Sequence, residues 1–582
     1  MPTSNLQGTA DQPELRFREP LLSSISFLAD AIGSVYFWWC LGLVWAGVLA
    51  LASRHGMNPD GLDYLDMASG ALSGGPSKLV NGYWSPGYPA LISIAMLIFR
   101  PSPRQEFPLI HGVNFFIFAL ALLAFTFFFR AWLSDTHRTE SVTDDERRYA
   151  IPFAFGTFLW FTLQFIGVGL VAPDLCVATI IFFAAGIGCR LSLPGSSWKH
   201  YVALGLVLAA GYYAKAAMFP LGLALLGVLF LWRPSQYLDR QKLLLSLITF
   251  LLLAAPLIAL MSRRVGRLSF GEVGRVAYLV YVNQVGDDVW VNDHGLKHPP
   301  RKLIDKPLTY EFASPIEGTY ALAYDPSYWY AGARVRFDLR QQIMALKETL
   351  RVYKDILEKT AAFIAGAIVL CGLILREKRL PRIPRNSWWQ LAWFFAACTM
   401  YALVYAEARY LAGFLVLFWL AVYGALMFRV NKSYAAPILA AVICTLMIPG
   451  IVEVVASVPA TLQNFVHAKP PDYEAVAVRL RELGLQSGDR LAVVGYSNDS
   501  YYARFARLRV VAQIPNADEF WRLSAPELNR LSQRLAAIGV KAIVARNRPV
   551  SCAFANWRDL NVSNSTGSSV LLLEDPPLPD TH

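Results

Sequence analysis

The chain has 582 residues, of which 55% are hydrophobic and only 16% charged, whereas a soluble protein has about 25% charged residues. Apolar runs of about 17–25 residues separate short charged segments, and runs of this length can cross a bilayer core of about 30 Å. The composition excludes a soluble enzyme and predicts an α-helical polytopic membrane protein. The net charge of +11 comes from Lys and Arg clustered between the apolar runs, as membrane topology requires, so we do not expect nucleic-acid binding.

In chain order, the pattern predicts a polar N-terminal tail (1–30) and then eleven membrane spans. The first span is too long and begins too late to be a signal peptide. The stretch 86–99 is also apolar, but it is short and contains Pro86 and Pro89, so we expect it to lie along the membrane. The expected spans cover about residues 31–52, 109–130, 150–168, 175–190, 200–216, 217–232, 243–261, 361–375, 387–405, 410–428 and 434–455.

Basic residues indicate the orientation of these spans. If 86–99 does not cross, every cluster of Lys and Arg between spans falls on one side of the membrane. The positive-inside rule then places the N-terminus in the cytoplasm and the C-terminus outside. We therefore expect a multi-pass protein of the inner (plasma) membrane, whose transmembrane domain (31–455) carries two outer loops, 53–108 and 262–360. The second loop is rich in Tyr and Trp, which predicts partial burial at the headgroup level.

The remaining segment, 456–582, predicts a small α/β domain outside the membrane. Helical patterns at 473–484 and 525–538 alternate with strand-like runs at 490–496, 508–514, 541–545 and 570–574. This alternation favours a partly parallel sheet. The loop after the first run reads GYSNDS, which is not a glycine-rich phosphate loop, so we expect a packing or acceptor-docking role rather than a nucleotide site.

A few isolated charges interrupt the apolar runs, where each costs about 2.5–3.5 kcal/mol and therefore indicates function. Asp174, Lys215, Glu407 and Arg409 all fall at the expected outer ends of spans. Together with aspartates of the first outer loop they could line one cavity, suited to a substrate with an anionic group and a hydroxyl. The alternative is that each charge is simply solvated at a helix end.

Three aspartates follow one another in that first outer loop. Asp60 lies between Pro59 and Gly61, a context that predicts a tight turn. Asp63 and Asp66, three and six residues later, fit the solvated face of a short amphipathic helix whose apolar residues (Leu62, Leu65 and Met67) would face lipid.

The motifs PDGLDYLDMA (59–68), NGYWSPGYPALISI (81–94), APDLCVA (172–178), GYYAKAAMFPLGLAL (211–225) and AEARYLAGFLVL (406–417) occur in this order. With the spans around them, they resemble the GT-C superfamily of polyprenyl-phosphate-sugar-dependent glycosyltransferases. The chain is similar to bacterial relatives of the protein O-mannosyltransferases and to lipid A aminoarabinose transferases. The resemblance covers about residues 31–430 and leaves out the C-terminal domain.

The resemblance implies roles for particular residues. Asp60 matches the aspartate proposed as general base, and Tyr64 and Ala68 match the pattern that follows it. The segment 85–89 matches one that opens a juxtamembrane helix, but Ser85 replaces its His or Lys, so Lys215 and Arg409 become the candidates for holding the donor phosphate. The other candidate substrate-binding residues are Tyr83, Trp84, Tyr88, Asp174, Glu407 and Tyr410.

The function implied is transfer of a sugar from a polyprenyl-phosphate donor to an acceptor hydroxyl at the outer face of the membrane, by single displacement with inversion. The acceptor could be a glycolipid, a wall polymer or a secreted protein. Carboxylate and His sets for a metal cannot be assembled and the cysteines show no metal spacing, so we expect no metal and no cofactor. The alternatives are a transporter or flippase for a lipid-linked sugar, and a scaffold whose outer domain binds cell-wall material.

Overall fold

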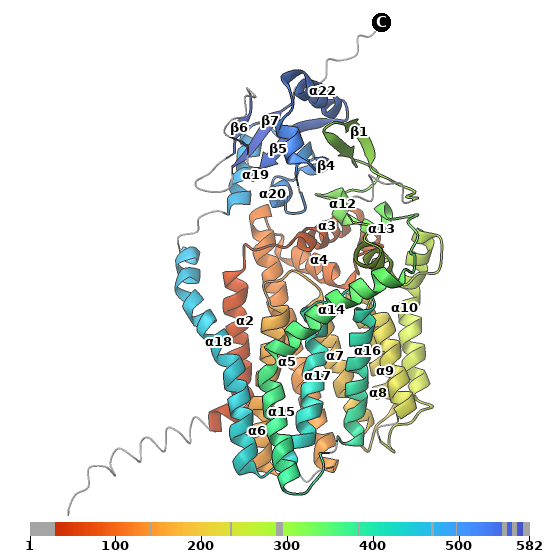
Figure 1. Cartoon of the computed structure of the whole chain (residues 1–582), viewed down its shortest axis with the longest axis vertical. Coiled ribbons are helices and arrows are strands. Elements are labelled where there is room, and N and C mark those ends of the chain that lie inside the picture. Colours follow the sequence, from red (N-terminus) through yellow and green to blue (C-terminus); the bar gives the residue numbers. More distant parts are fainter. Residues whose placement is uncertain are drawn as a thin grey trace, which may run out of the picture.

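The computed structural model describes residues 30–139, 143–232, 235–286, 295–381, 383–466, 471–495, 497–546, 548–549, 556–560 and 567–573. The expected N-terminal tail lies, apart from Asp30, outside these residues. The described chain forms a bundle of helices with a β-sheet at one end (Figure 1).

Each of the eleven apolar ranges falls on a helix of this bundle. In the described residues, seven helical stretches are long and apolar enough to cross a membrane, or eight if a bent pair of helices counts as one span. The other four helices on these ranges, α8, α9, α15 and α16, are too short to count on their own, so the number of eleven spans is not confirmed. The helices are α2 (Val35–Ala52), α5 (Glu106–Thr139), α6 (Asp144–Trp160) continued by η3 (Phe161–Ile166), α7 (Asp174–Leu191), α8 (Trp198–Ala214), α9 (Met218–Trp232), α10 (Leu243–Val265), α15 (Ala361–Arg376), α16 (Trp388–Ala402), α17 (Ala408–Leu426) and α18 (Lys432–Val466).

The bent pair is α14 (Leu339–Lys359) and α15, which meet at an angle of 63°. Helix α14 is amphipathic and runs obliquely across the bundle (Figure 1). Its charged residues alternate with exposed leucines such as Leu346 and Leu350, a composition that suits the boundary between lipid and water.

Two helices lie at the end of the bundle nearest the sheet: α3 (Pro59–Gly74) and α4 (Gly87–Phe99) (Figure 1). Helix α4 has 13 residues, about 20 Å at 1.5 Å per residue, which is too short to cross a bilayer. Helix α3 corrects two expectations. Asp60 belongs to its first turn rather than to an isolated turn, because Pro59 is favourable at the first helical position.

The second correction concerns the faces of α3. Asp63 and Asp66 are 2% and 8% exposed, not solvated, and Leu62 and Leu65 are buried in protein rather than facing lipid. The predicted helix is present, but segments distant in the sequence cover α3, and the local sequence pattern could not reveal them.

The sheet has seven strands in the order β1-β2-β4-β3-β5-β7-β6, with β3 parallel to β4 and β5 and all other pairs antiparallel. The expected partly parallel arrangement is therefore present. Three strands were not expected: β1 and β2, which come from the loop 262–360, and the two-residue strand β6. The strands are β1 (Arg301–Asp305), β2 (Leu308–Glu311), β3 (Arg490–Val494), β4 (Arg509–Ile514), β5 (Val540–Arg546), β6 (Arg558–Asp559) and β7 (Ser568–Leu572).

Helices cover both faces of this sheet. Successive side chains of a strand point to opposite faces, so Ala492 and Val494 pack with α22 (Ala525–Ala536) on one side. Leu491 and Val493 belong to the core that also contains residues of α19 (Asp472–Glu482) and α20 (Tyr501–Phe505) and continues into the bundle. The sheet is therefore joined to the helices by a continuous apolar core.

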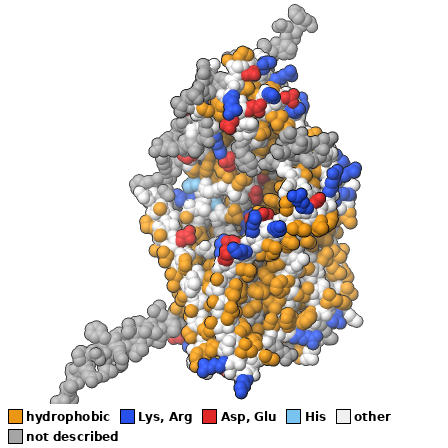
Figure 2. Space-filling model, viewed as in Figure 1, with side chains coloured by type: hydrophobic (Ala, Val, Ile, Leu, Met, Phe, Trp, Pro, Cys, Tyr) orange, Lys and Arg blue, Asp and Glu red, His pale blue; other side chains and the backbone are white. Residues whose placement is uncertain are grey.

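The surface of the bundle is consistent with a membrane protein. Figure 2 shows hydrophobic side chains covering much of the helical part of this face, with charged side chains gathered at its two ends. Helices α7, α15 and α17 carry Arg190, Arg376 and, just past its end, Arg429 at the ends away from the sheet.

Candidate functional site

Two cavities meet at the start of α3, between the bundle and the sheet. The first, here called the cation cavity, has a volume of about 390 Å³ and is lined by Asp174, Lys215, Glu407, Arg409 and Tyr410 among others. The second, the aromatic cavity, has a volume of about 430 Å³ and is lined by Asp63, Tyr310, Tyr320, Trp329 and Tyr330 among others. Asp60, Tyr83, Trp84 and Tyr281 line both cavities.

The cation cavity gathers its charged residues from the ends of four helices. Asp174 begins α7, and Lys215 lies in the break between α8 and α9. Arg409 lies in the first turn of α17, two residues after Glu407. The expected span ends therefore do meet in one place.

Ion pairs connect these residues into one cluster. The Lys215 ammonium lies 2.7 Å from Asp174 Oδ1, and Arg409 Nη1 lies 3.4 Å from Asp174 Oδ2. Arg409 Nε also pairs with Glu407 at 2.7 Å. Tyr410 donates to Glu407, and its ring lies 3.7 Å beneath the Lys215 ammonium. Two cations and two carboxylates balance one another, so an arriving anion meets donors that are already ionised and held in place.

The position of Asp60 is fixed by the residues around it. The Asn58 side chain accepts from the Val171 amide at 2.9 Å and donates to the Val171 carbonyl at 3.2 Å. It thereby ties the start of α3 to the segment just before α7. Gly61 allows this approach, because a Cβ there would lie 2.3 Å from the sulfur of Met57 and 3.1 Å from Val171.

The Asp60 carboxylate itself makes no hydrogen bond or ion pair with any residue that the structure describes. Burial raises its pKa from the ordinary value, and the nearby Arg409 guanidinium partly opposes this effect. A carboxylate with a raised pKa, free at the meeting point of two cavities, is able to take up a proton.

The aromatic pair Tyr83 and Trp84 is held by an Asn81 turn. Asn81 Oδ1 accepts from the amides of both residues, and its Nδ2 donates to the Tyr324 carbonyl at 2.6 Å. The next residue, Ser85, accepts from the Ala216 amide at 2.9 Å. Ser85 therefore fixes the backbone beside Lys215 and does not supply a charge of its own.

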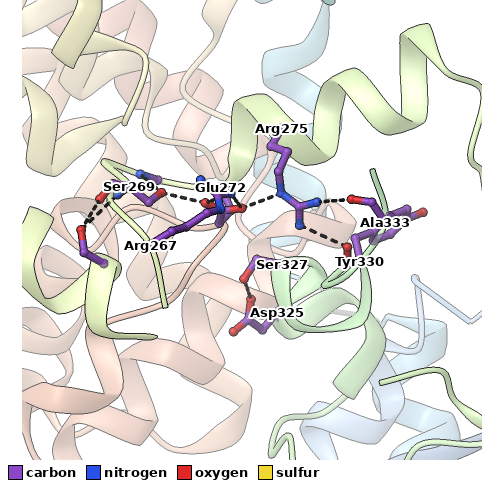
Figure 3. Close-up of polar contacts among 10 residues, drawn as sticks. Arg267, Ser269, Glu272, Arg275, Asp325, Ser327, Tyr330 and Ala333 are labelled. Carbon is purple, nitrogen blue, oxygen red and sulfur yellow. Dashed lines mark hydrogen bonds and ion pairs between the residues drawn. The ribbon is translucent and has the colours of Figure 1, made fainter. Parts of the chain in front are cut away.

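The wall shared by both cavities is a segment anchored by a buried carboxylate (Figure 3). Glu272 accepts hydrogen bonds from Arg267, Ser269 and Arg275, and Arg275 in turn donates to the carbonyls of Tyr330 and Ala333. These bonds fix the segment α11 (Val273–Ala277) and η4 (Tyr278–Val282), which carries Tyr281 into both cavities.

Nine of the ten candidate residues from the sequence line the cation cavity; their roles stay predictions. Tyr88 does not reach it. It is fully buried behind Tyr64, with ring centroids 5.1 Å apart, and donates to Asn114 at 2.7 Å. Among the residues described, no group of three or more His, Cys, Asp or Glu is arranged to hold a metal ion.

Sequence reasoning missed the aromatic cavity. Besides residues of the first outer loop, it is lined mainly by the loop 262–360 and by Gln513 of β4, which the sheet brings together. The aromatic runs AYLVYVNQ and DPSYWYAG were the available signal, and residues of both line the cavity.

Comparisons with known proteins agree on the fold. Over 93% of this chain and 99% of the other, the structure matches ArnT from Cupriavidus metallidurans bound to undecaprenyl phosphate, with 12% sequence identity and a TM-score of 0.53. The apo state of the same protein matches with 11% identity and a TM-score of 0.50, over 94% of this chain and 100% of that one. An oligosaccharyltransferase from Archaeoglobus fulgidus gives a lower TM-score of 0.43, with 14% identity, over 88% of this chain and 70% of that one.

No protein-family model matches the chain, and no curated protein sequence is significantly similar to it. These matches show that the chain has the fold of ArnT, as the resemblance of its motifs predicted.

Proposed function

We propose that this chain, which shares the fold of ArnT, is a membrane-embedded glycosyltransferase that moves a sugar from a polyprenyl-phosphate donor to an acceptor hydroxyl. The observation that carries the proposal is the position of Asp60, unpaired where a cavity lined by two cations meets a cavity lined by aromatic rings. The undecaprenyl phosphate bound to ArnT supports a polyprenyl-phosphate donor.

The donor phosphate would occupy the cation cavity. An ammonium has three donors and a guanidinium five, so Lys215 and Arg409 keep donors free after pairing with Asp174 and Glu407. Charge-assisted bonds to the phosphate would hold it and stabilise the negative charge that grows on it as it leaves.

Asp60 would act as the general base. As the acceptor oxygen forms its bond to the anomeric carbon, its proton passes to the Asp60 carboxylate, and the bond from that carbon to the phosphate oxygen breaks. The products are the glycosylated acceptor and the polyprenyl phosphate. Asp174 and Glu407 are both engaged in ion pairs, so with Asp60 as the base no carboxylate that lines the cation cavity in the described residues is left to form a covalent intermediate, which favours one displacement with inversion.

The test is a transfer assay with radiolabelled polyprenyl-phosphate sugar in vesicles that contain the full-length protein. Asp60→Asn keeps the size of the side chain but cannot take up the proton, so transfer should fall about 10²-fold or more while donor binding is retained. Asp518→Asn, at an exposed carboxylate of α21 (Ala517–Trp521), is the control. An Asp60→Asn protein that transfers at the wild-type rate contradicts the assignment, and label that crosses the membrane unchanged identifies a flippase instead.

The remaining parts of the proposal follow from the distribution of charge. Reaction at the outer face of an inner (plasma) membrane, with a cytoplasmic N-terminus, is supported by the basic side chains at the end of the bundle away from the sheet. Glycolipids, wall polymers and secreted proteins remain the candidate acceptors, and the domain at 456–582 would take part in docking them.

A further inference from the structure

Asp63 is buried like Asp66, but like Asp60 it has no partner among the described residues. It is 2% exposed, yet it makes no hydrogen bond or ion pair within the described parts of the chain. Asp66, one turn further along, has Arg504 at 2.7 Å and accepts two hydrogen bonds from Thr319. A buried carboxylate without a partner is costly, so the unpaired state of Asp63 requires an explanation that packing does not give.

Asp63 lines the aromatic cavity beside Asp60. The two carboxylates are one helical turn apart and therefore lie on the same face of α3. Burial and the two neighbouring aspartates raise the pKa of Asp63 well above its ordinary value. A carboxylate accepts hydrogen bonds, and its protonated form also donates one, so hydroxyl groups of a ligand complement Asp63 in either state.

The charge of the aromatic cavity narrows the class of ligand. No Lys, Arg or His is among its described lining residues, whereas the cation cavity contains Lys215 and Arg409. Two carboxylates without a cation disfavour any anionic group in this place. The two cavities are thus complementary to different parts of a reaction, one to a phosphate and the other to a polar group that is not anionic.

The side chains that line the aromatic cavity restrict the class of ligand further. Tyr310, Tyr320, Trp329 and Tyr330 offer apolar surface that can cover the C–H faces of a sugar ring, and a volume of about 430 Å³ falls in the usual range for small-molecule sites. An extended peptide that bound by strand addition would need a free strand edge at this cavity. Strand β2, which contributes Tyr310, is already paired with β1 and β4.

We propose that the aromatic cavity is the acceptor subsite, and that it takes an uncharged saccharide whose hydroxyl groups hydrogen-bond to Asp63 while the reacting hydroxyl reaches Asp60. The inference rests on the proposed function and names the chemical class of its acceptor. It reverses the expectation that Asp63 is a solvated residue of little consequence.

The experiment measures sugar binding without any donor, by saturation-transfer NMR on the full-length protein in lipid nanodiscs. The probes are methyl α-D-glucoside, which is neutral, glucosamine, which is cationic, and glucose 6-phosphate, which is anionic. The methyl glucoside should bind, and the glucose 6-phosphate should not. Asp63→Leu should weaken methyl glucoside binding at least tenfold, because a site built for hydroxyl groups loses its partner. Asp63→Asn, which still hydrogen-bonds, should weaken it less, and Asp518→Asn should leave it unchanged.

Binding of undecaprenyl phosphate is measured in parallel and should be unchanged in Asp63→Leu, which shows that the variant is folded. Equal methyl glucoside binding by Asp63→Leu and wild type overturns the proposal. So does a preference for glucosamine or glucose 6-phosphate, or a lack of binding by all three probes. Failure of the proposed function would appear separately, as a wild-type protein that neither binds undecaprenyl phosphate nor transfers sugar.

Discussion

Arg504 connects the C-terminal sheet region to the helix that carries Asp60, and its removal should loosen that contact. Its side chain, 6% exposed, lies 2.7 Å from Asp66 and 2.9 Å from Glu106. It also donates to Ser69 of α3. We expect Arg504→Met to leave buried carboxylates without their main partner while keeping an apolar side chain of similar length.

The free-energy cost of Arg504→Met depends on which partners Asp66 and Glu106 retain. Breaking a buried ion pair costs about 3–5 kcal/mol. Asp66 retains two hydrogen bonds from Thr319, and Glu106 retains Arg507, so the lower end, about 3 kcal/mol, applies. At about 1.4 kcal/mol per factor of ten, the equilibrium for opening the contact should rise on the order of 100-fold.

Hydrogen exchange measured by mass spectrometry reads this equilibrium directly. The Thr319 amide donates to Asp66 and the Val510 amide to the Thr319 carbonyl, so both amides should exchange on the order of 100-fold faster in Arg504→Met. Arg507→Met, at a side chain that is partly exposed, is the matched control and should cost about 1 kcal/mol or less.

A double variant separates charge from packing. Adding Asp66→Asn to Arg504→Met removes one uncompensated charge and should recover part of the protection, a coupling that independent sites do not show. Exchange at Thr319 that rises less than threefold in a folded Arg504→Met protein would refute the reasoning. In Arg504→Met, sugar transfer should decrease together with the protection of these amides from exchange, because Asp66 and Asp60 belong to one helix.

Three further outcomes are expected. Lys215→Met and Arg409→Gln should each weaken binding of undecaprenyl phosphate by about 1.5–3 kcal/mol, measured by equilibrium titration; unchanged binding in both would remove the phosphate assignment. Because Arg409 lowers the pKa of Asp60 against the effect of burial, Arg409→Gln should move the acidic limb of the transfer–pH profile to higher pH, since the base works only when ionised; a shift to lower pH would contradict this sign. A Cys introduced at Asp489 should react with an impermeant reagent from outside, and one at Lys378 only after the membrane is opened; the reverse pattern would invert the topology.

The cation cavity could be predicted because isolated charges in apolar spans are expensive. Asp174 and Lys215 each stand alone between long apolar runs, as does the pair Glu407 and Arg409. All of them fall at the expected outer ends of spans, where they could meet. The prediction for Asp63 was wrong, because helical periodicity indicates which residues share a face of a helix but not which other segments cover that face. The cover of α3 comes from Thr319 and Arg504, which are far away in the sequence.

Strands β1 and β2 show the same limit. Both are short, and they join the rest of the sheet only because β2 pairs with β4, roughly two hundred residues further along the chain. Four of the five strands at 490–572 could be predicted, because longer apolar runs alternate with helices there. The aromatic cavity depends on both groups of strands, so no single stretch of sequence could indicate it.

The shared sheet has a consequence for the biogenesis of this protein. Strands β1 and β2 are synthesised before α14 to α18, but β2 cannot pair with β4 until those helices have been inserted and the last part of the chain has followed. Until then, one edge of β2 is unprotected and open to other chains. A chain that ends between α17 and β4 would contain every residue of the cation cluster but could not complete the sheet beside the aromatic cavity. Quality control that recognises an unpaired strand edge would therefore also remove molecules able to hold a donor without selecting an acceptor.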